Sequence, residues 1–130
     1  FIGTPAMNLL DAVLIDYDAG QARFKVANQE VSLDVEPATA ELGIGSEVTL
    51  GIRPRAYDVV SESAADTFSA TVDLIEPMGA ETLIHMMDQG RDVRVVVDRK
   101  DHFSQGQHVH MRCRPQQAHV FNADGNRVSS

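Results

Sequence analysis

Tryptophan is absent from this 130-residue sequence, and aromatic residues make up only 5% of it. The core must therefore be built mainly from Val, Ile, Leu and Met, which favours strands. With few aromatic rings to stack on bases and a formal net charge of −8, the chain is not expected to bind nucleic acid. A chain of this length with 43% apolar and 23% charged residues is expected to fold as one ordinary globular domain.

Cys113 is the only cysteine, so an intramolecular disulfide is excluded and nothing indicates an oxidising compartment. The longest apolar stretches, NLLDAVLI and VRVVVD, are interrupted or ended by charge far short of the roughly 20 residues that span a bilayer. The sequence also has no GxxxxGK[ST] loop, no GxSxG, no HExxH and no CxxC motif. We therefore expect a cytoplasmic chain without a catalytic apparatus of its own, carried to any membrane by a partner.

Apolar and polar side chains alternate with a two-residue period along most of the chain, and this period predicts strands. In QARFKV (21–26), Ala22, Phe24 and Val26 share one face. No long segment holds a helical period, and EPATAELGIGSE (36–47) is expected to form a loop with room for one helical turn. Strands are predicted at 12–17, 21–26, 30–35, 47–53, 68–77, 81–88, 93–98, 108–115 and 118–122.

About ten short, mostly antiparallel strands make an all-β sandwich or barrel, because such a sheet must pack on another or close on itself. The first three predicted strands are separated by the short connections DAGQ and NQE, so they are expected in meander order. The small polar segment SESAAD (61–66) is the expected seam between two sub-halves of the domain, 1–60 and 67–130.

One predicted strand, HVHMRCRP (108–115), concentrates side chains that bind metals or anions. Its apolar residues alternate onto one face, and a polar set lies on the other: His108, His110, Arg112 and Arg114. Two histidines at this spacing can share a metal ion with His102 or Asp101, which are near in sequence. The same pattern is typical of a solvated polar face, so both interpretations stay open.

The other reactive side chains have simpler interpretations. Cys113 falls on the apolar face of its strand and is expected to be a buried, inert thiol. His85 and His119 lie inside apolar runs and are expected in the core or at its rim. Glu76 and Glu81 flank the turn PMGA and could act as an acid/base pair, but this spacing is also common in hairpins.

Four stretches of the sequence carry a resemblance to one protein family: FIGTPAMNLL (1–10), LGIRPR (50–55), EPMGAETLIH (76–85) and AHVFNADGNRV (118–128). Together they resemble the C-terminal regulatory domain of the ATP-binding subunit of ABC sugar importers, in particular the maltose and glycerol-3-phosphate importer subfamily. The start of the chain resembles the junction that leaves the nucleotide-binding domain in that family. The resemblance therefore implies that Phe1 is internal to a longer polypeptide, and that 1–130 is a single regulatory domain.

The resemblance implies an OB-like, all-β module of the kind called a TOBE domain, which is non-catalytic by itself. Family members use it for contact between two ATP-binding subunits, and in maltose-type importers it can receive inhibitory regulators. The implied partners are a second copy of the chain in a homodimer, permease subunits contacted through the missing domain, and a regulatory protein. ATP and Mg²⁺ would bind in that missing domain, with no cofactor in this region. The chain would be cytoplasmic and peripheral to the inner membrane.

Eight residues match family motif positions and are expected to be structural: Gly51, Ile52, Arg53, Pro54, Glu76, Pro77, Gly79 and Glu81. Gly51 is expected at a close backbone approach, and Pro54 at the end of its strand. Arg53 is expected to form a structural ion pair rather than to contact a ligand, and Gly79 to permit a turn or bulge. The family commonly has Glu where this chain has Arg55, so any contact of that carboxylate is in doubt.

A second function stays open beside the dimerisation module. Related TOBE domains in oxyanion importers bind the anion itself, so the strand face with Arg112 and Arg114 is a candidate cradle for an oxyanion or a sugar phosphate. Against this, both arginines can be paired with the many carboxylates of the chain.

Overall fold

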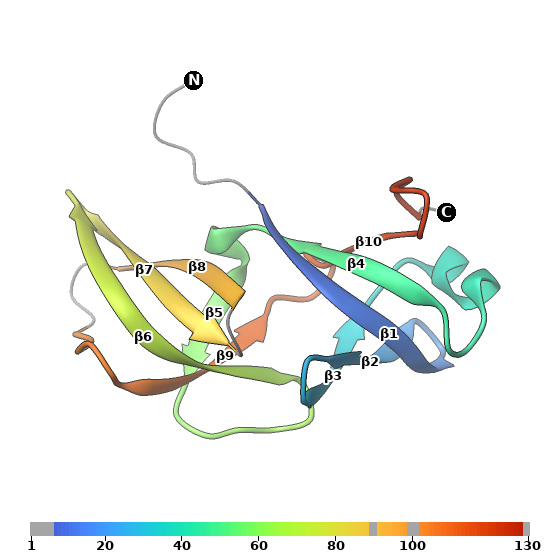
Figure 1. Cartoon of the computed structure of the whole chain (residues 1–130), viewed down its shortest axis with the longest axis horizontal. Coiled ribbons are helices and arrows are strands. Elements are labelled where there is room, and N and C mark those ends of the chain that lie inside the picture. Colours follow the sequence, from blue (N-terminus) through green and yellow to red (C-terminus); the bar gives the residue numbers. More distant parts are fainter. Residues whose placement is uncertain (1–6, 89–90, 99–101, 129–130) are drawn as a thin grey trace.

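The computed structural model describes residues 7–88, 91–98 and 102–128, and these residues form ten strands and two short 3₁₀ helices (Figure 1). The helices, η1 (Pro37–Leu42) and η2 (Pro54–Ala56), each begin at a proline, whose fixed φ suits the first helical position. The strands are β1 (Asn8–Asp18), β2 (Gln21–Val26), β3 (Gln29–Asp34), β4 (Glu47–Ile52), β5 (Tyr57–Val60), β6 (Thr67–Met78), β7 (Glu81–Asp88), β8 (Arg91–Asp98), β9 (His108–Cys113) and β10 (His119–Phe121).

The strands form two five-stranded antiparallel sheets, which lie on the right and on the left in Figure 1. The first sheet has the order β10-β4-β1-β2-β3, and the second has the order β5-β9-β6-β7-β8. One cluster of buried apolar side chains contains residues of both sheets, among them the fully buried Leu50 and Ile84. The expected all-β fold, with about ten antiparallel strands, is confirmed.

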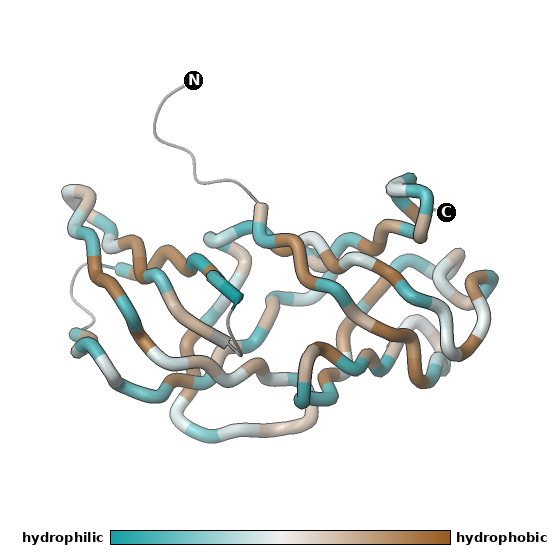
Figure 2. Tube along the Cα trace, in the orientation of Figure 1, coloured by the Kyte–Doolittle hydropathy of each residue, from teal (hydrophilic) through white to brown (hydrophobic). Residues whose placement is uncertain are grey.

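Alternation along the strands explains how the sheets bury one face. In Figure 2 hydrophobic segments follow the strands, while much of the hydrophilic colour lies at connections and strand ends. In β2 the three apolar residues are buried and the three polar ones are exposed. The predicted bounds of β2 and β7 match the structure to the residue, and β1, β2 and β3 pair in the expected meander order. The sequence did not predict β5, and the expected helical turn in 36–47 is η1.

The segment at 61–66 does not divide the two sheets. It joins β5 to β6, and both strands belong to the second sheet. The last strand, β10, returns to the first sheet and pairs with β4. Each expected sub-half therefore gives one strand to the sheet that is built mainly from the other half. Residues 1–60 give β5, which pairs with β9, and residues 67–130 give β10, which pairs with β4.

Two amide side chains connect the sheets through paired hydrogen bonds. The Nδ2 of Asn8, on β1, donates to the carbonyl oxygen of Arg94 at 2.8 Å, and the Arg94 N–H donates back to Oδ1 at 2.9 Å. Gln29, on β3, makes the same cyclic pair with the backbone of Ser69, at 2.9 and 2.7 Å. Each amide side chain thus makes the two hydrogen bonds that a neighbouring strand would make with a backbone unit of the other sheet.

No helix in the described part of the chain is long and apolar enough to cross a bilayer.

Candidate functional site

The polar face of β9 is formed as the alternation predicts. Val109, Met111 and Cys113 are buried, and the residues between them point to the other side. Burial, with a smaller contribution from the negative charge of Asp34, raises the pKa of the Cys113 thiol to about 12. A thiol that stays protonated at neutral pH is a poor nucleophile, so Cys113 serves as a small core residue.

The histidines proposed as metal ligands are brought together only in part. The rings of His108 and His110 lie 5.4 Å apart, and Nδ1 of His110 is 2.7 Å from the hydroxyl of Ser69. His102, in the segment before β9, lines a cleft with residues of other elements, and Asp101 lies outside the described residues. Within the described ranges no three His, Cys, Asp or Glu side chains form a group that could hold a metal ion.

The two arginines proposed as an anion cradle each pair with a carboxylate. The Nε of Arg112 lies 2.7 Å from Oδ2 of Asp66, in the loop before β6. The guanidinium of Arg114 donates twice to Oδ1 of Asp58, at 2.9 and 3.1 Å. Each carboxylate raises the pKa of its arginine. Both arginines are therefore paired with carboxylates, the alternative that the sequence left open.

Gly51 lies where a residue with a side chain would not fit unless its neighbours moved. A Cβ at this position would collide with the sulfur of Met7 and would lie 2.8 Å from the ring of Phe121. Ile52 is fully buried, and Pro54 ends β4 and begins η2. The absence of a side chain at Gly51 thus lets Met7 and Phe121 pack over the outer face of the first sheet.

Arg53 does not form the ion pair expected from the sequence. It is exposed, and the described residues contain no carboxylate in an ion pair with it. The residues next to Gly51 across the sheet are Leu9 and His119, and neither is acidic.

The hairpin of β6 and β7 separates the two glutamates that the sequence suggested as an acid/base pair. Oε1 of Glu76 lies 2.8 Å from Nε2 of the half-buried His85, whereas Glu81 pairs with Arg55 on η2. Gly79, with a φ of 84°, lies in the turn between the strands. Pro77 pairs only with β7, because β9 contacts β6 at 67–71, so its missing N–H removes no ladder bond on the other side.

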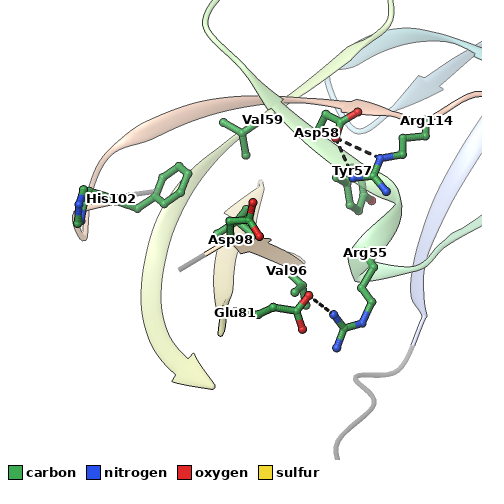
Figure 3. A pocket seen from close by; sticks show the side chains of 11 residues that line it. Arg55, Tyr57, Asp58, Val59, Glu81, Val96, Asp98, His102 and Arg114 are labelled. Carbon is green, nitrogen blue, oxygen red and sulfur yellow. Dashed lines mark hydrogen bonds and ion pairs between the residues drawn. The ribbon is translucent and has the colours of Figure 1, made fainter. Parts of the chain in front are cut away.

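A polar cleft of about 570 Å³ is the principal concave feature near these groups (Figure 3). Arg55 and Glu81 face each other on one side of it, and Arg114 and Asp58 on another. Its lining residues come from η2, β5, β7, β8, the segment before β9 and the segment after it: Arg55, Tyr57, Asp58, Val59, Glu81, Val96, Val97, Asp98, His102, Phe103 and Arg114.

The cleft combines hydrogen-bond donors with acidic side chains. Two guanidinium groups and a histidine can donate hydrogen bonds to an oxyanion, while three carboxylates lie among them. Both ion pairs are about half-exposed, and such pairs contribute only about 0–1 kcal/mol, so a dianion can compete for the arginines. Arg114, Glu81 and His102 were each named from the sequence but the cleft was not, because strand pairing brings Asp98 beside Glu81 and the packing of η2 on β8 brings Arg55 to them.

Comparison with known proteins places the fold and the family. The cytoplasmic molybdate-binding protein ModG superposes with a TM-score of 0.72 over 92% of this chain and 98% of that chain, at 14% sequence identity. The model of the TOBE domain matches residues 50–121, and that of the MalK OB fold domain matches residues 3–56. The fold is thus an OB-type, all-β module.

The chain belongs to the TOBE domain family, as it occurs in the ATP-binding subunits of ABC sugar and sn-glycerol-3-phosphate importers. It is similar to the sn-glycerol-3-phosphate import ATP-binding protein UgpC 1 of Rhizobium johnstonii, with 30% identity over 98% of this chain and 33% of the relative. The diacetylchitobiose uptake system ATP-binding protein MsiK of Streptomyces coelicolor is 30% identical, over 99% of this chain and 38% of the relative.

The maltose/maltodextrin import ATP-binding protein MalK of Vibrio vulnificus is 25% identical, over 96% of this chain and 34% of the relative. The chain thus spans about a third of the length of these curated relatives.

Proposed function

We propose that this chain is the regulatory and dimerisation module of the ATP-binding subunit of an ABC importer for sugars or glycerol-3-phosphate-like solutes. The observation that carries the proposal is the similarity of nearly the whole chain to import ATP-binding proteins. The module is non-catalytic by itself, and ATP and Mg²⁺ bind in a nucleotide-binding domain outside this region. Its partners are a second copy and a regulatory protein, and permease subunits hold the subunit at the cytoplasmic side of the membrane.

The outer face of the β6–β7 hairpin suits contact with a second copy. Leu74, Met78 and Met87 are exposed by 51%, 37% and 39% there. They lie on one face, because Met78 pairs with Glu81, Leu74 pairs with His85, and Met87 follows His85 by two residues. Exposed apolar side chains gathered in this way are typical of interaction sites.

Charge also favours this face over others. Two copies of a chain with a net charge of −8 repel each other, so a contact is most stable where carboxylates are already compensated. On this hairpin Glu76 is hydrogen-bonded to His85, and Glu81 is paired with Arg55. The two glutamates beside these apolar residues are therefore already compensated within the chain.

The test is the mass of the full-length subunit as a function of concentration, measured by sedimentation for the wild type, Met78→Glu and Ile44→Glu. Ile44 is 65% exposed in the loop before β4, so its variant carries the same new charge elsewhere. We expect the dimer dissociation constant to rise about tenfold or more for Met78→Glu and to stay at the wild-type value for Ile44→Glu. A wild-type subunit that stays monomeric at high concentration contradicts the dimerisation role.

A second candidate function is the sensing of a small oxyanion or a sugar phosphate in the polar cleft. Arg55 and Arg114 line it from two different segments, and both pairs that hold them are about half-exposed. Calorimetric titration with sn-glycerol 3-phosphate and with molybdate tests this function. Saturable binding that Arg55→Gln and Arg114→Gln abolish, and that Arg112→Gln retains, supports it; no heat with either anion removes it.

A further inference from the structure

Two arginines of the described residues lack the carboxylate partner that five others have. Ion pairs hold five other arginines in the described ranges: Arg23, Arg55, Arg94, Arg112 and Arg114. Within those ranges neither Arg53 nor Arg127 has such a pair, and Lys25 on β2 has none either. Because the chain has 19 acidic residues against 11 basic ones, a shortage of carboxylates does not explain this.

The register of the first sheet brings both arginines to one place. His119 on β10 pairs with Gly51, two residues before Arg53, and Phe121 forms a bridge with Arg127. Paired residues of antiparallel strands point to the same face, and the neighbouring row of Leu10, Leu50 and Val120 faces the core. His119, Phe121 and Arg127 thus lie on the outer face, with Arg53 at its end.

The same face carries exposed apolar surface. Leu9, which pairs with Gly51 from β1, is 64% exposed. Phe121 is only half-buried, although its ring packs over Gly51. Arginine beside aromatic and aliphatic side chains is the composition of energetically important residues in protein interfaces. We define the basic face as Leu9, Arg53, His119, Phe121 and Arg127.

The pKa of His119 agrees with the placement of the two arginines beside it. Burial lowers the pKa of His119, and the positive charges of Arg127 and Arg53 lower it further, while Glu36 acts in the opposite direction. Both arginines therefore raise the potential at one imidazole. Asp11 also lies on the outer face, in one row with Thr49, Phe121 and Arg127, and the strands that carry Thr49 and Phe121 separate it from Arg127.

We propose that the basic face is the docking surface for an acidic patch on the polypeptide that precedes this region in the full-length subunit. This inference rests on the proposed function, in which a nucleotide-binding domain comes first. The relatives are about three times as long as the chain. Met7, just before β1, packs over Gly51 within the same face, so a preceding domain is tethered beside it. Tethering raises its local concentration to roughly the millimolar range, which favours it over an untethered partner.

Hydrogen–deuterium exchange of the full-length subunit tests the inference. We compare the wild type with Arg53→Glu, Arg127→Glu and the control Lys25→Glu, which makes the same change at an unpaired cation of β2. Docking predicts that an acidic segment of the preceding domain exchanges about tenfold faster in both arginine variants than in the wild type, and that Lys25→Glu leaves its rate unchanged. Two independent arginine variants guard against the failure of one to fold.

Equal exchange in all four proteins overturns the inference. If the protection of that segment in the wild type disappears on dilution to the monomer, the face contacts a second copy, and this result overturns the inference as well. Light scattering on the same samples reports on dimerisation separately. A dimer with unchanged exchange in the arginine variants therefore refutes the docking surface and leaves the proposed function standing.

Discussion

In the second sheet and its connections, Arg94, Arg112 and Arg114 each form an ion pair with a carboxylate, whereas Arg53 and Arg127, at the edge of the first sheet, form none with the residues that the structure describes. The pairs of Arg112 and Arg114 are short, at 2.7 and 2.9 Å. Arg23, on the first sheet, lies 3.8 and 3.9 Å from its two carboxylates. The second sheet thus pairs these three arginines within the chain, whereas the first sheet carries the basic face.

The largest expected effect comes from breaking the link between the sheets at Asn8. Asn8→Ala removes two hydrogen bonds to Arg94 and leaves the backbone polar groups of that residue without their partner. We expect the free energy of unfolding to fall by about 2–4 kcal/mol, measured by urea denaturation. Gln29→Ala is the matched control, because it removes the equivalent pair at a half-exposed position, and it should have the smaller effect. Equal stability of Asn8→Ala and the wild type would contradict the role of this link.

A smaller effect is expected where the first sheet supports its basic face. In Gly51→Val the new side chain must displace Met7 and Phe121, so we expect a loss of about 1–3 kcal/mol in the same measurement. Thr49→Ala changes a half-buried side chain on the same face of β4 and should lose less than about 0.5 kcal/mol. If Gly51→Val unfolds at the same urea concentration as the wild type, the packing over Gly51 is not a constraint.

The smallest effect is expected from the ion pair that compensates the second sheet. Arg55→Glu places two carboxylates together and should lower the free energy of unfolding by about 0.5–1 kcal/mol. The double variant Arg55→Glu/Glu81→Arg restores opposite charges and should recover most of that loss. Non-recovery in the double variant would show that the pair itself does not stabilise the fold.

The strands were predictable because burial follows a local rule. Where alternation is unbroken, as in 21–26 and 81–88, the bounds agree with the structure. β5 was missed because its four residues follow the turn at Pro54 and are too few to show a period. The pairing of β10 with β4 of the first sheet could not be predicted either, since the pattern of a strand shows which face is buried but not which strand lies beside it.

The candidate sites were less predictable than the strands, because they depend on pairs that are distant in the sequence. Asp66 lies 46 residues before Arg112, and Asp58 lies 56 before Arg114. The sequence allowed that these arginines were paired but did not name the carboxylates. An ion pair was expected for Arg53, because lone strand arginines usually have one, but Arg53 forms none with the described residues. The amide links of Asn8 and Gln29 left no sequence signal, since an isolated polar residue in a strand does not show which backbone it meets.

The most direct test of the difference between the sheets is the pKa of His119, measured by NMR on histidine-labelled protein. The account predicts a pKa below 6.5 that rises in Arg127→Gln and Arg53→Gln and is unchanged in Arg112→Gln. Since the folded state then resists protonation, His119 should also make the protein less stable as the pH falls below about 6.5. A pKa at or above 6.5 that neither arginine variant moves would contradict the claim that unpaired arginines converge on this face.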